Sequence, residues 1–293
     1  MPAPIPPDAD PGPDRPASAT ALAAARLRAV HLLVDDPPPI LDDPVSGRLL
    51  DPAAIRTIGE DPERWASPSA RALRTEVVAR SRYAEDRLAE AVRRGVRQYI
   101  ILGAGLDTFA YRQPRWAARL RILEVDHPAS QRDKLARLRR AGILTPPNVR
   151  FVAADLEATD LGDRLAAAGL TMGRPVFVAC LGVLIYLGES ALDVIGSAVA
   201  GLAGGSELVI TFSRPDPTAA SAPAPGSPAA RVEAAGEPWR TRLEPDAVTR
   251  RLTRAGFRSV FMLFDADITE RYLQGRTDGL RAPARAAIAD AMV

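Results

Sequence analysis

The sequence predicts an α/β fold built on a doubly wound parallel sheet, with a helical extension before the sheet. Short apolar runs alternate with helical patterns from residue 99 onward, and the first of these runs ends in a glycine-rich turn. Such alternation implies right-handed crossovers and a sheet that is buried on both faces. A chain of 293 residues with 47% hydrophobic residues can bury this core as one domain.

The first part of the chain precedes the sheet. Residues 1–18 carry seven prolines, which predict a disordered tail. Ala19 to Val34 is alanine-rich with leucines at helical spacing and stops at Asp35-Asp36-Pro-Pro-Pro, and Pro68 to Arg94 has a second long helical pattern. We therefore divide the chain into a tail (1–18), N-terminal helices (19–94) and a sheet domain (95–293).

The sheet domain has a regular order of elements. Apolar runs predict strands near 99–103, 121–125, 149–153, 175–181 and 207–213. Between them, helical patterns lie near 107–118, 128–141, 159–168 and 190–202. A helix over Pro245 to Ala255, ended by Gly256, and a strand over Phe257 to Phe264 follow. Residues 286–293 stay ambiguous, because their alanines permit a helix as well as a strand.

One proline-rich segment, residues 214–238, interrupts this order just after the fifth strand. That position places it at the carboxyl edge of the sheet, where ligands bind in open α/β folds. A loop of this length inside a domain is usually a functional lid or a disordered insertion, and we expect a lid.

Composition excludes several classes of function. Lys+Arg 38 against Asp+Glu 36 gives a net charge of +2, and no basic block interleaved with aromatic residues supports nucleic-acid binding. The lone cysteine, Cys180, permits neither an intrachain disulfide nor a cysteine-based zinc site, and two histidines are too few for a three-histidine metal site. With no signal-peptide pattern and no membrane-length apolar run, we expect a cytoplasmic protein with no metal and no membrane partner.

The turn after the first strand has the features of a ligand-binding turn. Gly103 and Gly105 lack a Cβ and let the backbone pass close to a ligand. About 20 residues later a strand ends in Glu124 and Asp126, at the spacing where a carboxylate accepts hydrogen bonds from ribose hydroxyls. The pattern predicts a ligand with a ribose. The alternative is a tight strand-to-helix turn with no ligand.

The rest of the turn disfavours a dinucleotide. The third glycine of a pyrophosphate-binding turn is replaced by Thr108, which bulky Phe109 follows. Asp107 adds a negative charge that repels phosphate and suits a cationic ligand such as S-adenosylmethionine. A nicotinamide-dependent oxidoreductase remains the rival enzyme class, and cofactor titration would separate the two.

Four ordered blocks resemble the leucine carboxyl methyltransferase family. They are Arg-Ser-Arg-Tyr (80–83), Gly-Ala-Gly-Leu-Asp-Thr-x-Ala-Tyr-Arg (103–112), Glu-Val-Asp-x-Pro (124–128) and Leu-Gly-Val-Leu-Ile-Tyr-Leu (181–187). The bacterial branch of this family includes polyketide and other natural-product O-methyltransferases. The resemblance implies a class I methyltransferase, Rossmann-like, with seven strands, of which residues 286–293 would form the last and antiparallel one. It also implies S-adenosylmethionine as cofactor and N-terminal helices that cover the acceptor pocket.

The resemblance also implies the cofactor site. It assigns Arg80 to the carboxylate of S-adenosylmethionine, a role that suits a guanidinium because it grips a carboxylate with two hydrogen bonds. It assigns Asp126 to the cofactor, and it places Asp155 at the exocyclic amine of the adenine with Leu156 beside the ring. Without the resemblance, Arg82 competes with Arg80.

Other readings of these carboxylates also stay open. Glu124 lies on the same strand face as Asp126 and is a second candidate for the ribose. Asp126 could also cap the helix that begins at Pro128, and Asp155 could be an ordinary cap or turn aspartate.

The sequence departs from the family in one place. A glutamate that contacts the cofactor in much of the family is replaced within Cys180-Leu181-Gly182, where Leu181 carries no carboxylate. What remains there is the close approach that Gly182 permits. Cys180, in a buried strand with no neighbouring histidine, is expected to be inert.

The sequence leaves the catalytic residue unassigned. His31 is the one histidine in the region that covers the acceptor pocket in the family, and it is therefore the one candidate base. The alternative is an ordinary surface or half-buried histidine with no catalytic role. A carboxylic acid is already ionised at neutral pH, whereas a phenol benefits from a base. The shortage of histidine therefore favours methyl transfer to a carboxylic acid of a small secondary metabolite. The alternatives are a phenol with His31 as base, or a catalytically silent S-adenosylmethionine-binding protein.

Overall fold

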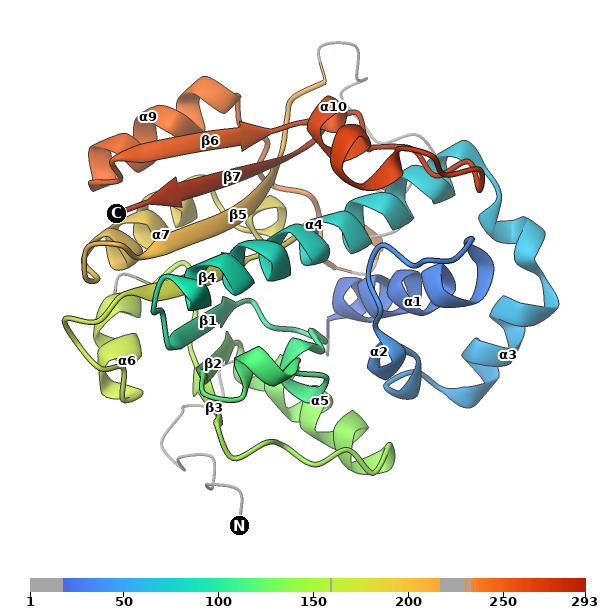
Figure 1. Cartoon of the computed structure of the whole chain (residues 1–293), viewed down its shortest axis with the longest axis horizontal. Helices are drawn as coiled ribbons and strands as arrows, with labels where there is room; N and C mark the ends of the chain where they lie inside the picture. Colours follow the sequence, from blue (N-terminus) through green and yellow to red (C-terminus); the bar gives the residue numbers. More distant parts are fainter. Residues whose placement is uncertain (1–17, 159, 217–229, 231–232, 235) are drawn as a thin grey trace.

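The computed structural model describes residues 18–158, 160–216, 230, 233–234 and 236–293, and it has the predicted α/β fold (Figure 1). Seven strands form one sheet in the order β3-β2-β1-β4-β5-β7-β6, in which β7 alone runs antiparallel to its neighbours. The strands are β1 (Gln98–Leu102), β2 (Arg121–Asp126), β3 (Val149–Ala153), β4 (Val176–Cys180), β5 (Glu207–Ser213), β6 (Ser259–Leu263) and β7 (Ala286–Met292). The doubly wound seven-strand sheet is therefore confirmed.

Helices cover both faces of the sheet, as the strand sequences require. Alternate residues of β1 point to opposite sides: Ile100 and Leu102 pack with α6 (Leu161–Ala167), α7 (Ala191–Ala200) and α9 (Pro245–Ala255), while Tyr99 and Ile101 pack with α4 (Pro68–Arg93). Figure 1 shows α4 crossing in front of the central strands. After β2, α5 (Pro128–Arg140) leads on to β3.

The helical extension lies beside the sheet and begins with α1 (Ala19–Val34), where it was predicted. Between α1 and α4 lie two helices that were not predicted, α2 (Pro44–Arg48) and α3 (Pro52–Glu60), and a 3₁₀ turn at Pro62–Trp65. Each begins with an aspartate that caps the helix and a proline at its first position. These repeated Asp-Pro pairs are the signal by which the sequence could have shown them.

Two predictions about secondary structure change. The helix expected near 107–118 is two 3₁₀ turns, Phe109–Tyr111 and Arg115–Ala117, because the Asp107 carboxylate takes the Phe109 N–H and Pro114 lies between the turns. The ambiguous end of the chain is β7, antiparallel to β5 and β6.

The remaining elements complete the described chain. The connection from β6 to β7 holds α10 (Asp265–Ile268) and one π-helical turn at Thr269–Leu273. The predicted tail, except residue 18, and most of the proline-rich segment 214–238 lie outside the described residues. No helix of the described part has both the length and the apolar character needed to span a membrane.

Candidate functional site

Two glycine turns meet where the strand order reverses, at the carboxyl ends of β1 and β4. Gly103 and Gly105 follow β1 with φ of 66° and 40°, and Gly182 follows β4 with φ of 71°. A Cβ added to Gly103 would lie 2.3 Å from Val183 Cγ2, so this turn accepts only glycine. In open α/β sheets this switch point is the place where ligands bind.

Asp126 joins the first of these turns to the end of β2. Its carboxylate accepts hydrogen bonds from the Gly105 N–H at 2.5 Å and from the His127 N–H at 2.6 Å. Burial raises the pKa of the Asp126 carboxyl, while these two backbone donors lower it. The predicted cap role of Asp126 is wrong, because His127 is the N-cap of α5 and its Nδ1 accepts from the Ala129 N–H.

Glu124 is separated from this site by its own partners. Its side chain is 1% exposed, Lys134 Nζ lies 2.6 Å from its Oε2, and the Tyr111 hydroxyl donates to the same oxygen at 3.3 Å. Glu124 is thus held in a buried ion pair between β2 and α5. Of the two carboxylates on this strand face, Asp126 is the one left half-buried at the strand end.

Arg80 approaches the second glycine turn from α4. A Cβ added to Gly182 would lie 2.3 Å from Arg80 Nη2, which puts the guanidinium directly over this glycine. The Gly182 N–H donates to Thr211 Oγ1 of β5 at 2.6 Å, and Arg80 Nη1 lies 3.4 Å from Glu76 Oε1 on its own helix. The guanidinium therefore faces the carboxyl edge of the sheet.

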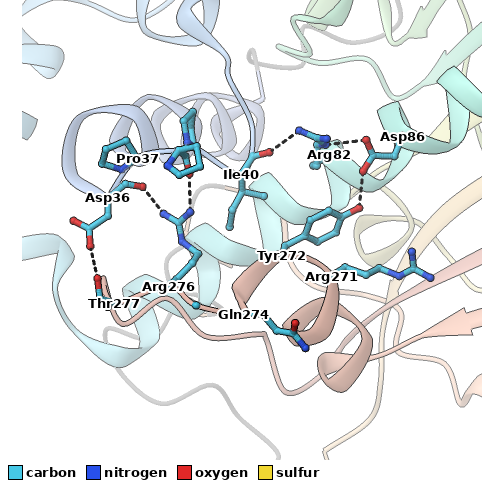
Figure 2. A pocket seen from close by; sticks show the side chains of 13 residues that line it. Asp36, Pro37, Ile40, Arg82, Asp86, Arg271, Tyr272, Gln274, Arg276 and Thr277 are labelled. Atoms are coloured by element: carbon cyan, nitrogen blue, oxygen red, sulfur yellow. Dashed lines mark hydrogen bonds and ion pairs between the residues drawn. The ribbon is translucent and has the colours of Figure 1, made fainter.

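Arg82 lies on another face of α4 and lines a different pocket. Figure 2 shows this pocket, of about 530 Å³, between α4, the Pro37–Ile40 segment and the chain after α10. Arg82 pairs there with Asp86, which also accepts from the Tyr272 hydroxyl at 3.0 Å. Of these two arginines, Arg80 contacts a glycine turn and Arg82 does not. This geometry favours Arg80 as the candidate cofactor ligand.

Asp155 and Leu156 follow β3 at the same edge. The Ala154 N–H donates to the Asp126 carbonyl, so this segment lies beside the end of β2. Asp155 is exposed, and its Oδ1 accepts from the Glu157 N–H at 2.9 Å in an Asx turn. Leu156 is buried in the core that α6 and α7 cover.

His31 is a structural residue in this fold. Its side chain is 0% exposed, Nδ1 bonds Asp35 Oδ2 at 2.8 Å, and Nε2 accepts from the Ile40 N–H at 2.9 Å. Because Nε2 accepts, the ring proton lies on Nδ1 and points to Asp35. Both ring nitrogens are already hydrogen-bonded within the protein, and neither is free to take a proton from an acceptor. The prediction that His31 is the general base is therefore wrong.

A buried ionic network that sequence reasoning missed fastens the N-terminal helices to the first glycine turn. Asp43 is 0% exposed and accepts from Arg28 Nε at 2.8 Å and Thr108 Oγ1 at 2.7 Å, with Arg112 Nε 3.4 Å away. Arg28 also donates to the Leu106 carbonyl at 2.6 Å. Thr108 and Arg112 belong to the block that follows the glycines, which is the one sequence signal for this network.

The described residues offer neither a group of metal ligands nor a reactive cysteine. Among the described residues, no group of three or more His, Cys, Asp or Glu side chains could hold a metal ion. Cys180 is fully buried, which raises its pKa to about 12. A thiol with this pKa is protonated at neutral pH and is a poor nucleophile.

The sequence profile of one family matches this chain over residues 21–200; its description is leucine carboxyl methyltransferase. A protein of Mycobacterium ulcerans (strain Agy99), named "Putative S-adenosyl-L-methionine-dependent methyltransferase", is 31% identical over 88% of this chain and 83% of its own length. A protein of Bacillus subtilis (strain 168) with the same description is 29% identical over 90% of this chain and 94% of its own length.

Solved structures show the same fold at low sequence identity. A crystal structure described as that of a "putative methyltransferase" from Thermobifida fusca YX covers 92% of this chain and 93% of its own, with a TM-score of 0.54 and 18% identity. A crystal structure described as that of a "duf574 family protein" from Streptomyces avermitilis has a TM-score of 0.52 and 18% identity. The match covers 91% of this chain and 96% of that protein's chain.

Proposed function

The chain belongs to the leucine carboxyl methyltransferase family and is an S-adenosylmethionine-dependent methyltransferase, and we propose that it transfers the methyl group to an oxygen atom of a small organic acceptor. The observation that supports this proposal is the meeting of two positive-φ glycine turns, Asp126 and Arg80 at one edge of the sheet.

The residues of this edge fit the cofactor chemically. The turn at Gly103 has a positive φ and packs against Val183, so it carries no side chain at this edge of the sheet. Asp126 is a half-buried acceptor suited to ribose hydroxyls, and the Arg80 guanidinium suits the methionine carboxylate. Asp155 would accept from the adenine amine, with Leu156 beside the ring. When bound, S-adenosylmethionine supplies a methyl group on a positively charged sulfur.

The chain's own contribution to the reaction is positioning. Methyl transfer to oxygen needs in-line alignment and exclusion of water more than it needs acid or base. α1 lies close over the first turn, since a Cβ on Gly105 would be 3.1 Å from Ala21 Cβ, and Arg28 ties that helix to the Leu106 carbonyl. We propose that the N-terminal helices 19–94 cover the acceptor pocket in this way.

The acceptor is a carboxylic acid or a hydroxyl compound of secondary metabolism on this proposal. The engagement of His31 removes the base that the phenol alternative relied on. The acceptor screen described below distinguishes these two classes.

Leu181 supports one further candidate, a protein that binds S-adenosylmethionine without turnover, because the family's carboxylate is missing at this position. Retained affinity for S-adenosylhomocysteine with no methyl transfer to any carboxylic acid or phenol would favour it.

Calorimetry with S-adenosylhomocysteine and with NAD tests the cofactor, and a screen with radiolabelled S-adenosylmethionine over carboxylic and phenolic metabolites tests the acceptor. Tighter binding of NAD than of S-adenosylhomocysteine would overturn the proposal.

A further inference from the structure

Two acidic side chains are buried near each other between α4 and the sheet. Glu207 is the first residue of β5 and its side chain is 0% exposed, while Asp290 lies on β7 and its side chain is 4% exposed. Val209 of β5 lies opposite Asp290, so both acids lie on the same face of the two paired strands. Their register partners on this face, Phe177 and Val209, are apolar and fully buried. Both carboxyl groups therefore lie in an apolar part of the core.

One guanidinium of α4 contacts both carboxyl groups. Arg87 Nε lies 2.8 Å from Glu207 Oε1 and 2.7 Å from Asp290 Oδ2. Nε carries a single hydrogen, so it cannot make a full hydrogen bond to both oxygens at once. Because both oxygens are within hydrogen-bond distance of the same atom, they also lie close to each other. Two ionised carboxylates would repel each other in this position.

The nearby guanidiniums do not balance the acids around them. Arg87 also contacts Glu90 on its own helix, and Arg94 donates to Glu207 Oε2. Two guanidiniums thus serve three carboxyl groups. Arg94 is 41% exposed, and water weakens the attraction of an exposed cation. Ionisation of all three acids would leave this cluster with an excess of negative charge.

Asp290 is the less well satisfied of the two buried acids. Its Oδ2 accepts from the Tyr83 hydroxyl at 2.6 Å, but its Oδ1 is buried and has no hydrogen-bond partner in the part of the chain that the structure describes. An ionised carboxylate in this position is costly, because one of its oxygens has lost water and gained no donor. Burial and the charge of Asp290 raise the pKa of the Tyr83 hydroxyl, so this donor keeps its proton at neutral pH.

The charged and titratable groups that surround the two acids come from α4 and the π-helical turn. Within the described residues they are Tyr83, Arg87, Glu90, Arg94 and Arg271, the last with its guanidinium 5.8 Å from the Tyr83 ring. In these surroundings burial raises the pKa of the Glu207 carboxyl to about 7, the charge of Asp290 adds to the rise, and Arg87 and Arg94 oppose it. The two carboxyl groups therefore titrate together near neutral pH.

We propose that Glu207 and Asp290 hold one proton between them in the folded protein, which makes their contact with α4 sensitive to pH. The proton removes one of two negative charges that compete for the same N–H. In the unfolded chain both groups are hydrated and release the proton at a lower pH, so unfolding is coupled to proton release. α4 also carries Arg80, about one turn before Tyr83, so this contact holds the helix that presents the proposed cofactor ligand.

The direction of the pH effect follows from the raised pKa. The folded pair holds its proton more tightly than the unfolded chain does. Its contribution to stability is therefore complete below the ordinary Glu pKa of 4.5 and is lost as the pH rises to about 7. Between these values one proton leaves on unfolding, and the unfolding equilibrium constant should rise about tenfold for each pH unit from this pair alone.

Urea unfolding of the parent and Asp290→Asn from about pH 5 to 8 tests the proposal. The amide oxygen can still accept from the Tyr83 hydroxyl, but one negative charge is gone, and Glu207 has Arg87 and Arg94 to itself. The variant should lack the pH dependence of the pair. We therefore expect the ratio of its unfolding constant to that of the parent to fall about tenfold or more between about pH 5 and 7.5, whatever its stability at one pH. Glu207→Gln should act in the same direction.

Two substitutions at exposed positions of α4 test the pair without changing either buried acid. Glu90→Gln removes the third carboxylate that Arg87 serves, so the parent's pH dependence should move to lower pH. Arg94→Gln removes a cation from Glu207, so the same dependence should move to higher pH. Each shift should be about half a pH unit or more.

The matched control is Asp133→Asn, the same change at a carboxylate that pairs with Arg137 on α5 at 2.7 Å. It should keep the pH dependence of the parent. A ratio that stays constant with pH in Asp290→Asn and Glu207→Gln would overturn the proposal. If these two variants do not fold, unfolding curves of Glu90→Gln and Arg94→Gln decide: opposite shifts support the shared proton, and an unmoved pH dependence in both refutes it.

Discussion

The guanidinium of Arg80 lies directly over Gly182, so that a Cβ on this glycine would be 2.3 Å from Nη2. This contact joins the long helix before the sheet to the turn after β4. The preceding residue is Leu181, where much of the family carries a glutamate, so this position supplies no carboxylate to the Arg80 guanidinium. Arg80 and the backbone of Gly182 should therefore act as one unit.

Substitution of Gly182 by alanine tests this unit. The new Cβ must displace the Arg80 guanidinium, and the backbone φ of 71° is strained for alanine at a cost of about 1–2 kcal/mol. We expect affinity for S-adenosylhomocysteine, measured by calorimetry, to fall about tenfold or more, the scale of one weakened charge-assisted hydrogen bond. Gly162→Ala is the control, since its Cβ would meet nothing within 4 Å. Unaltered affinity in Gly182→Ala would show that Arg80 is not a cofactor ligand.

Arg80→Ala and Asp126→Ala should each weaken the binding of S-adenosylhomocysteine by about 1.5–3 kcal/mol, because each removes a charge-assisted hydrogen bond. Arg82→Ala, which removes a side chain that is 46% exposed on another face of α4, should have no such effect. Calorimetry gives the affinities and thermal unfolding checks the fold. If both variants bind like the parent, these residue assignments are wrong even though the fold stands.

Asp126→Ala should also carry a second, structural effect. Its carboxylate holds the Gly105 and His127 N–H groups, which become unsatisfied in the variant. We therefore expect Asp126→Ala to lower the melting temperature more than Arg80→Ala does. Asp126→Asn, whose amide oxygen can still accept from one of these donors, should fall between the parent and Asp126→Ala in stability.

The buried network at Asp43 predicts a loss of stability in acid. Burial alone would raise the pKa of the Asp43 carboxyl, but Arg28 and Arg112 together hold it below its usual value. A depressed folded-state pKa contributes stability that is complete above the unfolded value of about 3.9 and is lost as the pH falls through the folded value. The contribution of Asp43, measured in urea as the difference in free energy of unfolding between the parent and Asp43→Asn, should therefore be steady down to about pH 5 and fall below about pH 4.

Asp43→Asn should remove part of this acid loss and cost about 3–5 kcal/mol at pH 7, because it leaves the buried Arg28 without its carboxylate, while Arg112 keeps Glu85. Asp42→Asn, at the exposed neighbouring position, serves as control. A pH dependence identical in Asp43→Asn and the parent would show that this network does not govern acid stability.

The sequence predicted the features that local pattern determines and missed those that distant contacts determine. The strands, the turn at Gly103 and the strand-terminal Asp126 were predictable, because periodicity and glycine placement are local signals. The environment of His31 was not, since the Nε2 partner, the Ile40 N–H, depends on how the chain returns after its proline run. The Asp43 network was missed as well, because only the packing brings Arg28 of α1 and Thr108 after β1 to the same carboxylate.

The last prediction concerns His31 and separates a structural from a catalytic histidine. His31→Gln removes one or both hydrogen bonds of a fully buried ring, to Asp35 and from the Ile40 N–H, and should cost about 1–3 kcal/mol of stability. At a temperature where the variant is folded, its methyl-transfer rate at saturating acceptor should have the same pH profile as the parent.

Stopped assays from about pH 5 to 9, with unfolding followed in parallel, test this. A rising limb in the parent that disappears in His31→Gln would restore His31 as the base. A pH profile that is unchanged in His31→Gln is the outcome that the buried and doubly hydrogen-bonded ring of His31 requires.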